Sequence, residues 1–452
     1  LATSSAASDV YKRQDMVIQN KERITEALNT DFGARSPNQS LISDVYGVLP
    51  AFSHAKKHLK SWMKDEKRKS NFPFGFMGAK SYIHREPLGV VGMISPWNFP
   101  MYLSLAPLAG IFSAGNQVMH KPSEFTPITS ELLKEICDSA FDETEFATFL
   151  GGPEVGAAFT QLKFDHLLFT GSGNIGKHVM RAASENLVPL TLELGGKSPV
   201  IVSDSSNIDI TARRVMFNKT LNAGQICLAP DYVYVHETEK DNFVEACKDQ
   251  VNEFYSDLKY NPDYTSVINE KHYDRLNGLL SDAKDHGAEV VEINPANEDF
   301  SQQESHKIPP TLVLNPTDEM QIMKEEIFGP LLPIKTYKDI NEPINYINKN
   351  DKPLGLYYFG NNKNEEAKVI NSTTSGGVTV NDIMGHIQQN ELGFGGVGPS
   401  GMGKYDGYDG FTNFSNNKPI YKQIGFGLDK LLDAIRPPYK GSIEDVLKKL
   451  LK

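Results

Sequence analysis

The chain has few cysteines, no surplus of positive charge and no long apolar run, and each shortage excludes a class of protein. Three cysteines in 452 residues cannot form a disulfide framework, and none belongs to a C-x-x-C pair. We therefore expect a reducing, cytoplasmic compartment. The net charge of −11 leaves no basic stripe for nucleic acid or an anionic membrane surface. No apolar run is long enough to span a bilayer.

Length and composition set the domain organisation. A chain of 452 residues exceeds what one compact core supports, so two large domains are expected. The first residues, LATSSAASDVYKRQ, differ abruptly from those that follow, and we expect residues 1–14 to be a non-native leader.

Short apolar runs alternate with helical patterns along most of the chain. Strands are expected at PLGVVGMIS, QVMHKPS, FDHLLFTGS and PLTLELG, with helices between them. This alternation predicts an α/β fold with a doubly wound parallel sheet, and a second α/β series follows to about residue 385. Ligands bind beyond the carboxyl ends of such strands. The glycine-dense segment that begins with TSGGVTVND is expected to be a loop, and FSNNKPIYKQ an edge strand.

Cys227 lies in the stretch LNAGQICLAP, in a setting unlike that of the other two cysteines. Cys137 and Cys247 occupy helical positions in LLKEICDSAF and NFVEACKDQV, which indicates structural roles. Cys227 instead follows the end of a predicted helix, in a loop closed by Pro230. A lone cysteine is more often packed and inert than catalytic. A thiol with a pKa of about 8.5 also needs a base to act as a nucleophile.

Glu193 is the candidate base. In TLELGGK it stands inside an apolar strand, where a carboxylate without a partner is costly, although a structural ion pair or a strand-end cap explains it equally well. No histidine lies in a glycine-bounded loop near Cys227. His54 and His58 have the spacing of a metal pair, but the sequence supplies no third ligand. A solvated helix face is the favoured interpretation, and no metal is expected.

Two turns at predicted strand ends are candidates for binding. FTGSGNIGK holds three glycines spaced as in a dinucleotide phosphate turn. Because Asp204 follows too late for that motif, a helix N-terminus open to an anion is the safer interpretation. SPWNFPM holds Asn98 between two aromatic residues and two prolines. The amide is either part of a rigid turn or a donor to a developing oxyanion.

Taken together, seven motifs resemble the aldehyde dehydrogenase superfamily in order and spacing over nearly all of residues 15–425. They are PWNFP, KPSE, FTGS, LELGGKSP, GQIC, EEIFGP and FGGVGPSGMGKY. Stretches such as GGPEVGAAF and PPTLVLNP are similar to the coniferyl aldehyde dehydrogenases within that superfamily. One departure is Gly173, where the family usually has threonine or another polar residue. The resemblance implies NAD(P)-dependent oxidation of an aldehyde to a carboxylic acid.

The resemblance also implies a role for each site residue. Cys227 would attack the aldehyde carbonyl, with Asn98 and the backbone N–H of Cys227 holding the oxyanion of the thiohemiacetal. Glu193 would activate the water that hydrolyses the thioester. The residues expected to bind the cofactor are Lys121, Glu124, Trp97, Ser95, Gly171, Ser172, Gly176, Glu326 and Phe328. Because the Glu124 carboxylate would repel a 2′-phosphate, NAD is favoured, and NADP is left open.

The same resemblance divides the chain. Residues 15–68 and 88–195 would form an NAD-binding domain and residues 196–400 a catalytic domain. Residues 69–87 and 410–425 would form a small bridging hairpin, and residues 426–452 a helical tail. An exposed hairpin edge invites pairing, so a homodimer is expected.

Two other classes of function and two classes of substrate are left open. A cofactor-independent thiol hydrolase or acyltransferase would use Cys227 and Glu193 but leave HKPSE and EEIFGP without a task. A non-catalytic protein on the same scaffold would be expected to lack the nucleophile or the base, and both are present. The substrate is expected to be an aromatic aldehyde such as coniferyl aldehyde or a medium-chain aliphatic aldehyde.

Overall fold

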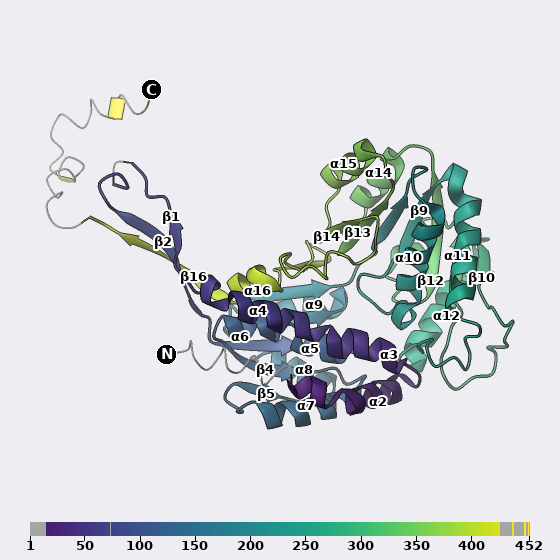
Figure 1. The fold of residues 1–452 in the computed structure, drawn as a ribbon, viewed down its shortest axis with the longest axis horizontal. Coiled ribbons are helices and arrows are strands. Elements are labelled where there is room, and N and C mark those ends of the chain that lie inside the picture. Colours follow the sequence, from purple (N-terminus) through teal and green to yellow (C-terminus); the bar gives the residue numbers. More distant parts are fainter. Residues whose placement is uncertain (1–14, 73, 425–435, 438–446, 449–450, 452) are drawn as a thin grey trace.

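The computed structural model describes residues 15–72, 74–424, 436–437, 447–448 and 451. The leader expected at residues 1–14 and most of the helical tail expected at 426–452 lie outside the described residues. The described chain forms three sheets of six, seven and three strands, with helices packed around the two larger ones (Figure 1).

The six-stranded sheet has the order β15-β7-β6-β3-β4-β5 and is parallel except for β15. Its strands are β3 (Val90–Ile94), β4 (Gln117–Lys121), β5 (Phe146–Thr148), β6 (His166–Gly171), β7 (Leu190–Leu194) and β15 (Gly401–Met402). The chain leaves β3 toward β4 and β5, and then returns to β6 on the other side of β3. Such a reversal opens a crevice beyond the carboxyl ends of the two neighbouring strands.

Helices cover this sheet because their apolar residues recur at helical spacing. In α7, for example, Leu132, Leu133 and Ile136 are buried while the residues between them reach solvent. The helices are α2 (Lys21–Phe32), α3 (Pro37–Ser40), α4 (Val48–Trp62), α5 (Pro100–Leu105), α6 (Leu108–Ser113), α7 (Pro127–Ala140), α8 (Pro153–Thr160) and α9 (Gly173–Ser184). A π-helical turn, Leu41–Tyr46, joins α3 to α4.

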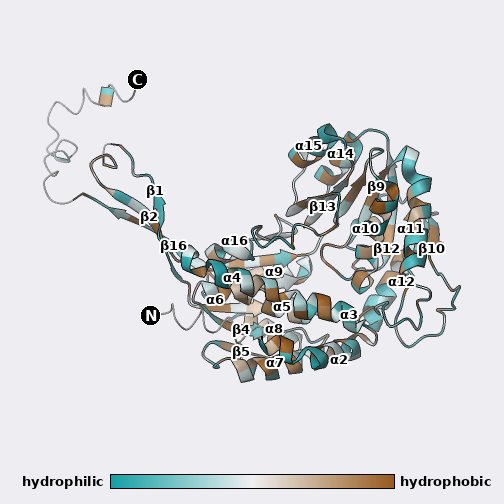
Figure 2. Cartoon of the chain, viewed as in Figure 1, coloured by the Kyte–Doolittle hydropathy of each residue, from teal (hydrophilic) through white to brown (hydrophobic). Residues whose placement is uncertain are grey.

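The seven-stranded sheet has the order β10-β11-β12-β9-β8-β13-β14, and only β10 runs antiparallel to its neighbour. Its strands are β8 (Pro199–Val202), β9 (Tyr232–His236), β10 (Glu289–Glu292), β11 (Thr311–Leu314), β12 (Leu331–Tyr337), β13 (Gly355–Phe359) and β14 (Gly377–Val380). Its helices are α10 (Ile208–Thr220), α11 (Lys240–Phe254), α12 (Glu270–Asp285), α13 (Gln321–Lys324), α14 (Asn341–Lys349) and α15 (Lys363–Ser372). Apolar strands lie between helices whose outer faces carry hydrophilic residues (Figure 2).

Strand β14 corrects one expectation from the sequence. The segment TSGGVTVND was expected to be a loop, but Gly377 to Val380 pair in parallel with Gly355 to Tyr358 of β13. The segment is too short and too glycine-rich to give a clear strand pattern, and it is half-buried at the edge of the sheet. Its pairing with β13 therefore decides its structure, a context effect that sequence alone does not reveal.

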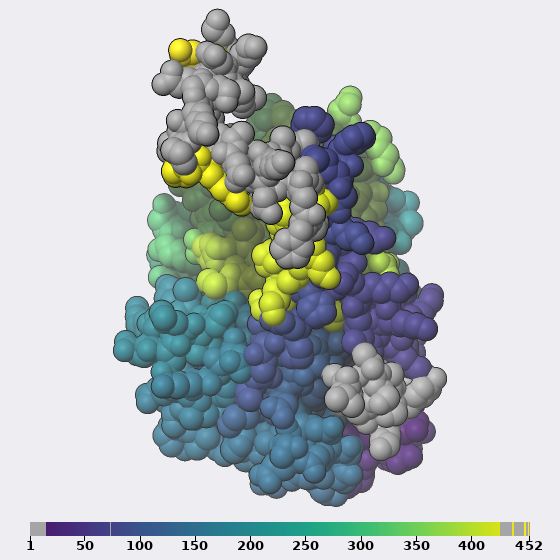
Figure 3. Space-filling view, turned by 90° about the vertical axis from the view of Figure 1, so that its left-hand side faces the viewer, coloured from purple at the N-terminus to yellow at the C-terminus, as the bar shows by residue number. Residues whose placement is uncertain are grey.

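A three-stranded arm projects from the body of the molecule (Figure 1). It contains β1 (Glu66–Arg68), β2 (Lys80–Pro87) and β16 (Ser415–Lys422) in the order β1-β2-β16. Eight residues of β16 pair antiparallel with β2, which confirms the edge strand expected at FSNNKPIYKQ. The space-filling view shows the yellow segment around β16 against the blue segment that contains β2 (Figure 3). The domain boundaries drawn from the sequence stay a prediction.

No helix among the described residues is both long and apolar enough to cross a membrane.

Candidate active site

Cys227 lies on a loop whose backbone is held in an uncommon conformation. Helix α10 ends at Thr220, and Asn222 and Ala223 in the next turn both have φ of 51°. Left-handed backbone is unfavourable for residues with a Cβ atom, more so for alanine than for asparagine. Such strain persists only where surrounding contacts determine the conformation. The Asn-Ala-Gly sequence thus reverses the chain after α10 and brings Cys227 to the cavity described below.

Hydrogen bonds from three segments hold this loop. Asn222 Nδ2 donates to the carbonyl oxygen of Asn98 at 3.1 Å, and Asn98 Nδ2 donates to the carbonyl oxygen of Gln225 at 3.1 Å. Gln225 Nε2 donates to the Ser266 carbonyl at 3.0 Å, and Gln225 Oε1 accepts the Ile268 N–H at 3.0 Å. Asn98 is therefore fixed directly against the segment that carries the thiol.

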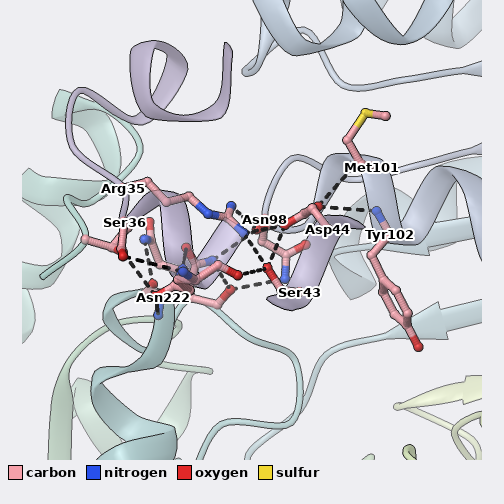
Figure 4. Close-up of polar contacts among 11 residues, drawn as sticks. Arg35, Ser36, Ser43, Asp44, Asn98, Met101, Tyr102 and Asn222 are labelled. Atoms are coloured by element: carbon pink, nitrogen blue, oxygen red, sulfur yellow. Dashed lines mark hydrogen bonds and ion pairs between the residues drawn. The ribbon is translucent and has the colours of Figure 1, made fainter. Parts of the chain in front are cut away.

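A buried ion pair between Arg35 and Asp44 also holds Asn98 in position (Figure 4). Arg35 and Asp44 are fully buried, and Arg35 Nη2 lies 2.5 Å from Asp44 Oδ2. Arg35 Nη1 also donates to the Asn98 carbonyl at 2.9 Å, while Asp44 Oδ1 accepts the N–H groups of Met101 and Tyr102 at 3.1 and 3.3 Å. This network satisfies charges that would otherwise be costly to bury. It also fixes the start of α5 next to Asn98.

The site residues expected from the sequence converge on one cavity of about 260 Å³. Eight of the twelve line it: Trp97, Asn98, Gly171, Ser172, Glu193, Cys227, Glu326 and Phe328. Trp97 and Asn98 follow β3, whereas Ser172 follows β6, so the cavity opens at the crevice between these neighbouring strands.

The remaining four expected residues do not line the cavity. Lys121 is the last residue of β4 and Glu124 follows the strand, and they form an ion pair in which Lys121 Nζ donates to Glu124 Oε2 at 2.7 Å. Ser95 is buried, with its hydroxyl 2.9 Å from Nε2 of His120. Gly176 allows α9 to lie close to β7, since a Cβ atom there would be 2.8 Å from Leu194 Cδ2. Ser95 and Gly176 therefore lie behind the lining residues, and their contact with the cofactor stays a prediction.

The pKa values of Cys227 and Glu193 depend on each other because the two side chains are neighbours. Burial raises the pKa of Glu193 to about 8. The pKa of the Cys227 thiol is raised well above its ordinary value, first by burial and then by the neighbouring carboxyls of Glu193 and Glu326, while its own backbone N–H lowers it. Near neutral pH the thiol therefore holds its proton, whereas Glu193 is partly ionised. Glu193 Oε1 has no hydrogen-bond partner, so the carboxyl is free to bind water or a proton from the thiol.

The opposite wall has the features of a dinucleotide site. Ser172 caps α9 and accepts the Ile175 N–H at 3.5 Å, and the positive end of that twelve-residue helix favours a phosphate. Glu326 Oε1 is buried without a partner, as a group that awaits a ribose hydroxyl would be. Glu326 lies so close to Gly195 that a Cβ atom there would be 2.1 Å from Oε2. These residues fit a nicotinamide dinucleotide.

Aromatic rings form much of this wall. The Trp97 ring centroid lies 5.4 Å from those of both His272 and Phe328, and 6.4 Å from that of Phe125. Burial lowers the pKa of His272 to about 4, so its ring is neutral at physiological pH. Aromatic faces of this kind accept a planar ring by stacking.

Sequence reasoning missed the contribution of α12. His272 and Arg275 line the cavity, and Arg275 Nη2 donates to the Ile327 carbonyl at 2.6 Å. The sequence EKHYDRLNGLL is an ordinary amphipathic helix pattern, so nothing in it indicates that its polar face meets the cavity. Thr170 also lines the cavity. It lies within the recognised motif FTGS but was not singled out as a site residue.

The fold and the site together define a class of enzyme in which a thiol and a buried carboxyl share a cavity with a dinucleotide wall. The family model described as the aldehyde dehydrogenase family matches residues 5–420. The chain belongs to that family, whose members oxidise aldehydes with a nicotinamide dinucleotide.

Within this family, the chain is similar to particular proteins whose sequences or structures are known. The chain is 53% identical to a probable coniferyl aldehyde dehydrogenase of Caulobacter vibrioides and 50% identical to a coniferyl aldehyde dehydrogenase of a Pseudomonas species. Each match covers 96% of this chain and 89% of the relative. A solved structure described as the substrate-bound state of Staphylococcus aureus AldH superposes with a TM-score of 0.90. It is 38% identical and covers 99% of this chain and 95% of that chain.

Proposed function

We propose that this enzyme oxidises an aromatic aldehyde of the cinnamaldehyde type, such as coniferyl aldehyde, to its carboxylic acid, with NAD as the cofactor. The observation that carries the proposal is the convergence of Cys227, Glu193 and Asn98 on one cavity. The two coniferyl aldehyde dehydrogenases that are half identical to this chain support the substrate class.

The nucleophile is Cys227. Its thiol transfers a proton to Glu193 as the sulfur attacks the aldehyde carbon, because a carboxyl with a pKa of about 8 is a useful base near physiological pH. The resulting thiohemiacetal carries an oxyanion. The backbone N–H of Cys227 and the side-chain amide of Asn98 stabilise it, and the latter exchanges its hydrogen bond to Gln225 for one to the substrate.

Glu193 acts again in the second half of the reaction. A bound nicotinamide dinucleotide supplies the hydride acceptor that turns the thiohemiacetal into a thioester. Glu193 first releases to solvent the proton that it took from the thiol. Its carboxylate then takes a proton from a water molecule that attacks the thioester, the carboxylic acid is released, and Cys227 leaves as the thiolate. The unpartnered Oε1 of Glu193 is the atom that binds this water.

The residues that hold the cofactor lie at the carboxyl ends of β3, β4 and β6 and in the segment that leads into β12. Ser172 and the turn from Gly171 receive the pyrophosphate at the start of α9, Glu326 the nicotinamide ribose, and Trp97 and Phe328 the nicotinamide ring. Lys121 and Glu124 bind the adenosine ribose. The Glu124 carboxylate, paired with Lys121 at 2.7 Å, accepts a ribose hydroxyl and repels a 2′-phosphate. This pair is the reason for proposing NAD over NADP.

The arm supports a homodimer. Strand β16 is an open edge of eight residues, and Phe72 and Phe76 on the arm are 86% and 90% exposed. Open edges and exposed aromatic residues are features that a partner subunit covers. We also propose that the two larger sheets mark the NAD-binding and catalytic domains. Three cysteines without a disulfide favour a reducing, cytoplasmic compartment.

A panel of aldehydes tests the proposal. Purified protein is mixed with NAD or NADP and with coniferyl aldehyde, benzaldehyde, hexanal or decanal, and reduced nicotinamide is followed by its absorbance. We expect the highest kcat/KM with coniferyl aldehyde and NAD. A preference for decanal or hexanal would replace the aromatic substrate with an aliphatic one. Nucleotide binding without turnover of any aldehyde would contradict the proposal.

A further inference from the structure

Three side chains with metal-binding chemistry meet outside the catalytic cavity. His54 and His58 lie on α4, and Glu391 lies in the segment between β14 and β15. One ligand atom from each lies within 4.8 Å of the others, and His54 Nε2 is 3.2 Å from Glu391 Oε1. Within the described part of the chain, no other group of three or more histidine, cysteine, aspartate or glutamate residues has this geometry.

The helix explains two of the ligands and the tertiary fold explains the third. Residues four apart lie on one face of a helix, so α4 brings the two imidazoles together. This is also the spacing of paired histidine ligands in helical zinc sites. The sequence contains no third ligand near this pair. Glu391 comes from a distant part of the chain and reaches them because α16 (Gly407–Asn413), which follows it, packs against α4.

Aromatic contacts hold the imidazole rings in place. The His58 ring is nearly parallel to the Trp62 ring, at 20° and with centroids 6.0 Å apart. The His54 ring lies 4.5 Å from the His58 ring and 5.6 Å from Trp62, which in turn packs 5.6 Å from Phe411. Oriented ligands lose less conformational entropy when they bind an ion.

The environment also favours a cation. The His54 side chain is only 12% exposed and lies against the Glu391 carboxylate. Glu391 adds one negative charge, and its side chain is 75% exposed, which leaves room for water ligands.

We propose that His54, His58 and Glu391 bind one divalent transition-metal ion, with zinc as the best match to two imidazoles and one carboxylate. Zinc places its ligands at about 2.0–2.2 Å, so tetrahedral ligand atoms are about 3.3–3.6 Å apart. His54 Nε2 and Glu391 Oε1, at 3.2 Å, already have nearly this separation, and no pair of the three ligand atoms is more than 4.8 Å apart. Water completes the coordination.

The ion would join α4 to the segment that contains Glu391, and that segment continues to the strand neighbour of Glu193, the catalytic base. The segment that contains Glu391 continues to Ser400 and Gly401. The Ser400 carbonyl accepts the Leu194 N–H at 3.0 Å, and Gly401 pairs with Glu193. A metal between α4 and Glu391 therefore stiffens the strand neighbour of Glu193. The inference concerns binding and does not depend on which aldehyde is oxidised.

Zinc binding to the untagged full-length protein, measured by competition with a chromophoric chelator, tests the site. His58→Asn and Glu391→Gln each remove one ligand. His178→Asn is the matched control because His178 is exposed on α9, away from α4. Cys227→Ala tests whether the catalytic thiol is the zinc ligand instead. Cobalt spectra of the same proteins distinguish nitrogen and oxygen ligands from sulfur, since a thiolate ligand adds an intense charge-transfer band.

We expect one zinc equivalent, bound about tenfold or more weakly by His58→Asn and Glu391→Gln but unchanged in His178→Asn and Cys227→Ala. The cobalt spectrum should lack the thiolate band. The thermal midpoint of each variant without metal shows that it is folded. The proposal is overturned if the wild type binds no zinc, if both ligand variants bind it as tightly as the wild type, or if binding disappears with Cys227.

Discussion

The two walls of the catalytic cavity are built by different physical means. The nucleophile wall, defined by Asn98 and Cys227, is held by buried hydrogen bonds and by the Arg35–Asp44 ion pair. The cofactor wall, defined by Trp97 and its aromatic neighbours, is held mainly by ring contacts 5.4–6.4 Å between centroids. Hydrogen bonds fix direction, whereas ring contacts tolerate small displacements.

This difference matches what each wall must do. The thiol, the amide donor and the base act on one carbon atom, so a small misplacement is costly. A dinucleotide must instead enter and leave in every turnover, and a wall of apolar rings provides contact area without fixed hydrogen bonds. Substitutions on the nucleophile wall should therefore have large effects, and substitutions on the cofactor wall small ones.

Cys227→Ala should have the largest effect on activity. Without the thiol no covalent intermediate forms, so aldehyde oxidation should fall by about 10⁴-fold or more. Nucleotide affinity, measured by calorimetry, should be unchanged because the cofactor wall is intact. Cys247→Ala, at a buried helical position, is the control for loss of a thiol elsewhere. Oxidation that persists in Cys227→Ala would remove the nucleophile from the account.

Arg35→Met should have the largest effect on stability. The substitution leaves Asp44 buried without its cation, which typically costs about 3–5 kcal/mol of unfolding free energy. Denaturant titration measures the loss. Arg23→Met is the matched control, because Arg23 forms a half-exposed pair with Glu135 on the surface and should cost less than about 1 kcal/mol. Equal losses for the two variants would contradict a special role for the buried pair.

Glu193→Gln should change how stability depends on pH. The pKa of Glu193 is about 8 in the folded protein and near 4.5 in the unfolded chain, so the folded state binds the extra proton between these values. Wild-type stability therefore falls as pH rises from 4.5 to 8. Between pH 6 and 9 the variant should gain about 2–3 kcal/mol relative to the wild type.

Denaturant titrations at the two pH values measure this gain, with the exposed Glu143→Gln as the control. A constant difference between Glu193→Gln and wild type across this range would show that Glu193 ionises normally.

His272→Ala should have the smallest effect. One aromatic contact with Trp97 is worth about 0.5–1 kcal/mol, so the KM for the nucleotide should rise about twofold to fivefold while kcat stays nearly constant. Steady-state kinetics separate the two parameters, and His178→Ala is the surface control. A loss of kcat as large as that from a nucleophile-wall substitution would break the distinction between the walls.

The sequence predicted local elements and motifs better than the contacts between distant segments. Glu193 was recognisable because a carboxylate inside an apolar strand is unusual, and Cys227 because its loop differs from the helices that carry the other cysteines. Strand β14 was missed because its pairing with β13, not its own residues, determines it.

Long-range contacts account for the other failures. Arg35 and Asp44 have no motif, and their role depends on meeting Asn98 across the fold. Nothing in the pattern of α12 indicates that His272 faces the cavity. The His54–His58 spacing was visible, but the interpretation as a solvated face followed from the absence of a nearby third ligand, and Glu391 arrives only through folding.

Trapping the covalent intermediate tests the central claim most directly. Glu193→Gln is mixed with NAD and coniferyl aldehyde, quenched in acid, and examined by intact-protein and peptide mass spectrometry. The account predicts one acyl group, the aldehyde minus two hydrogens, on the peptide that contains Cys227, together with one equivalent of reduced nicotinamide. Both should form more slowly than in the wild type, because the amide cannot take the thiol proton, but the adduct should accumulate because its hydrolysis also lacks a base. Reduced nicotinamide formed at the wild-type steady rate with no adduct, or an adduct on Cys137 or Cys247, would contradict it.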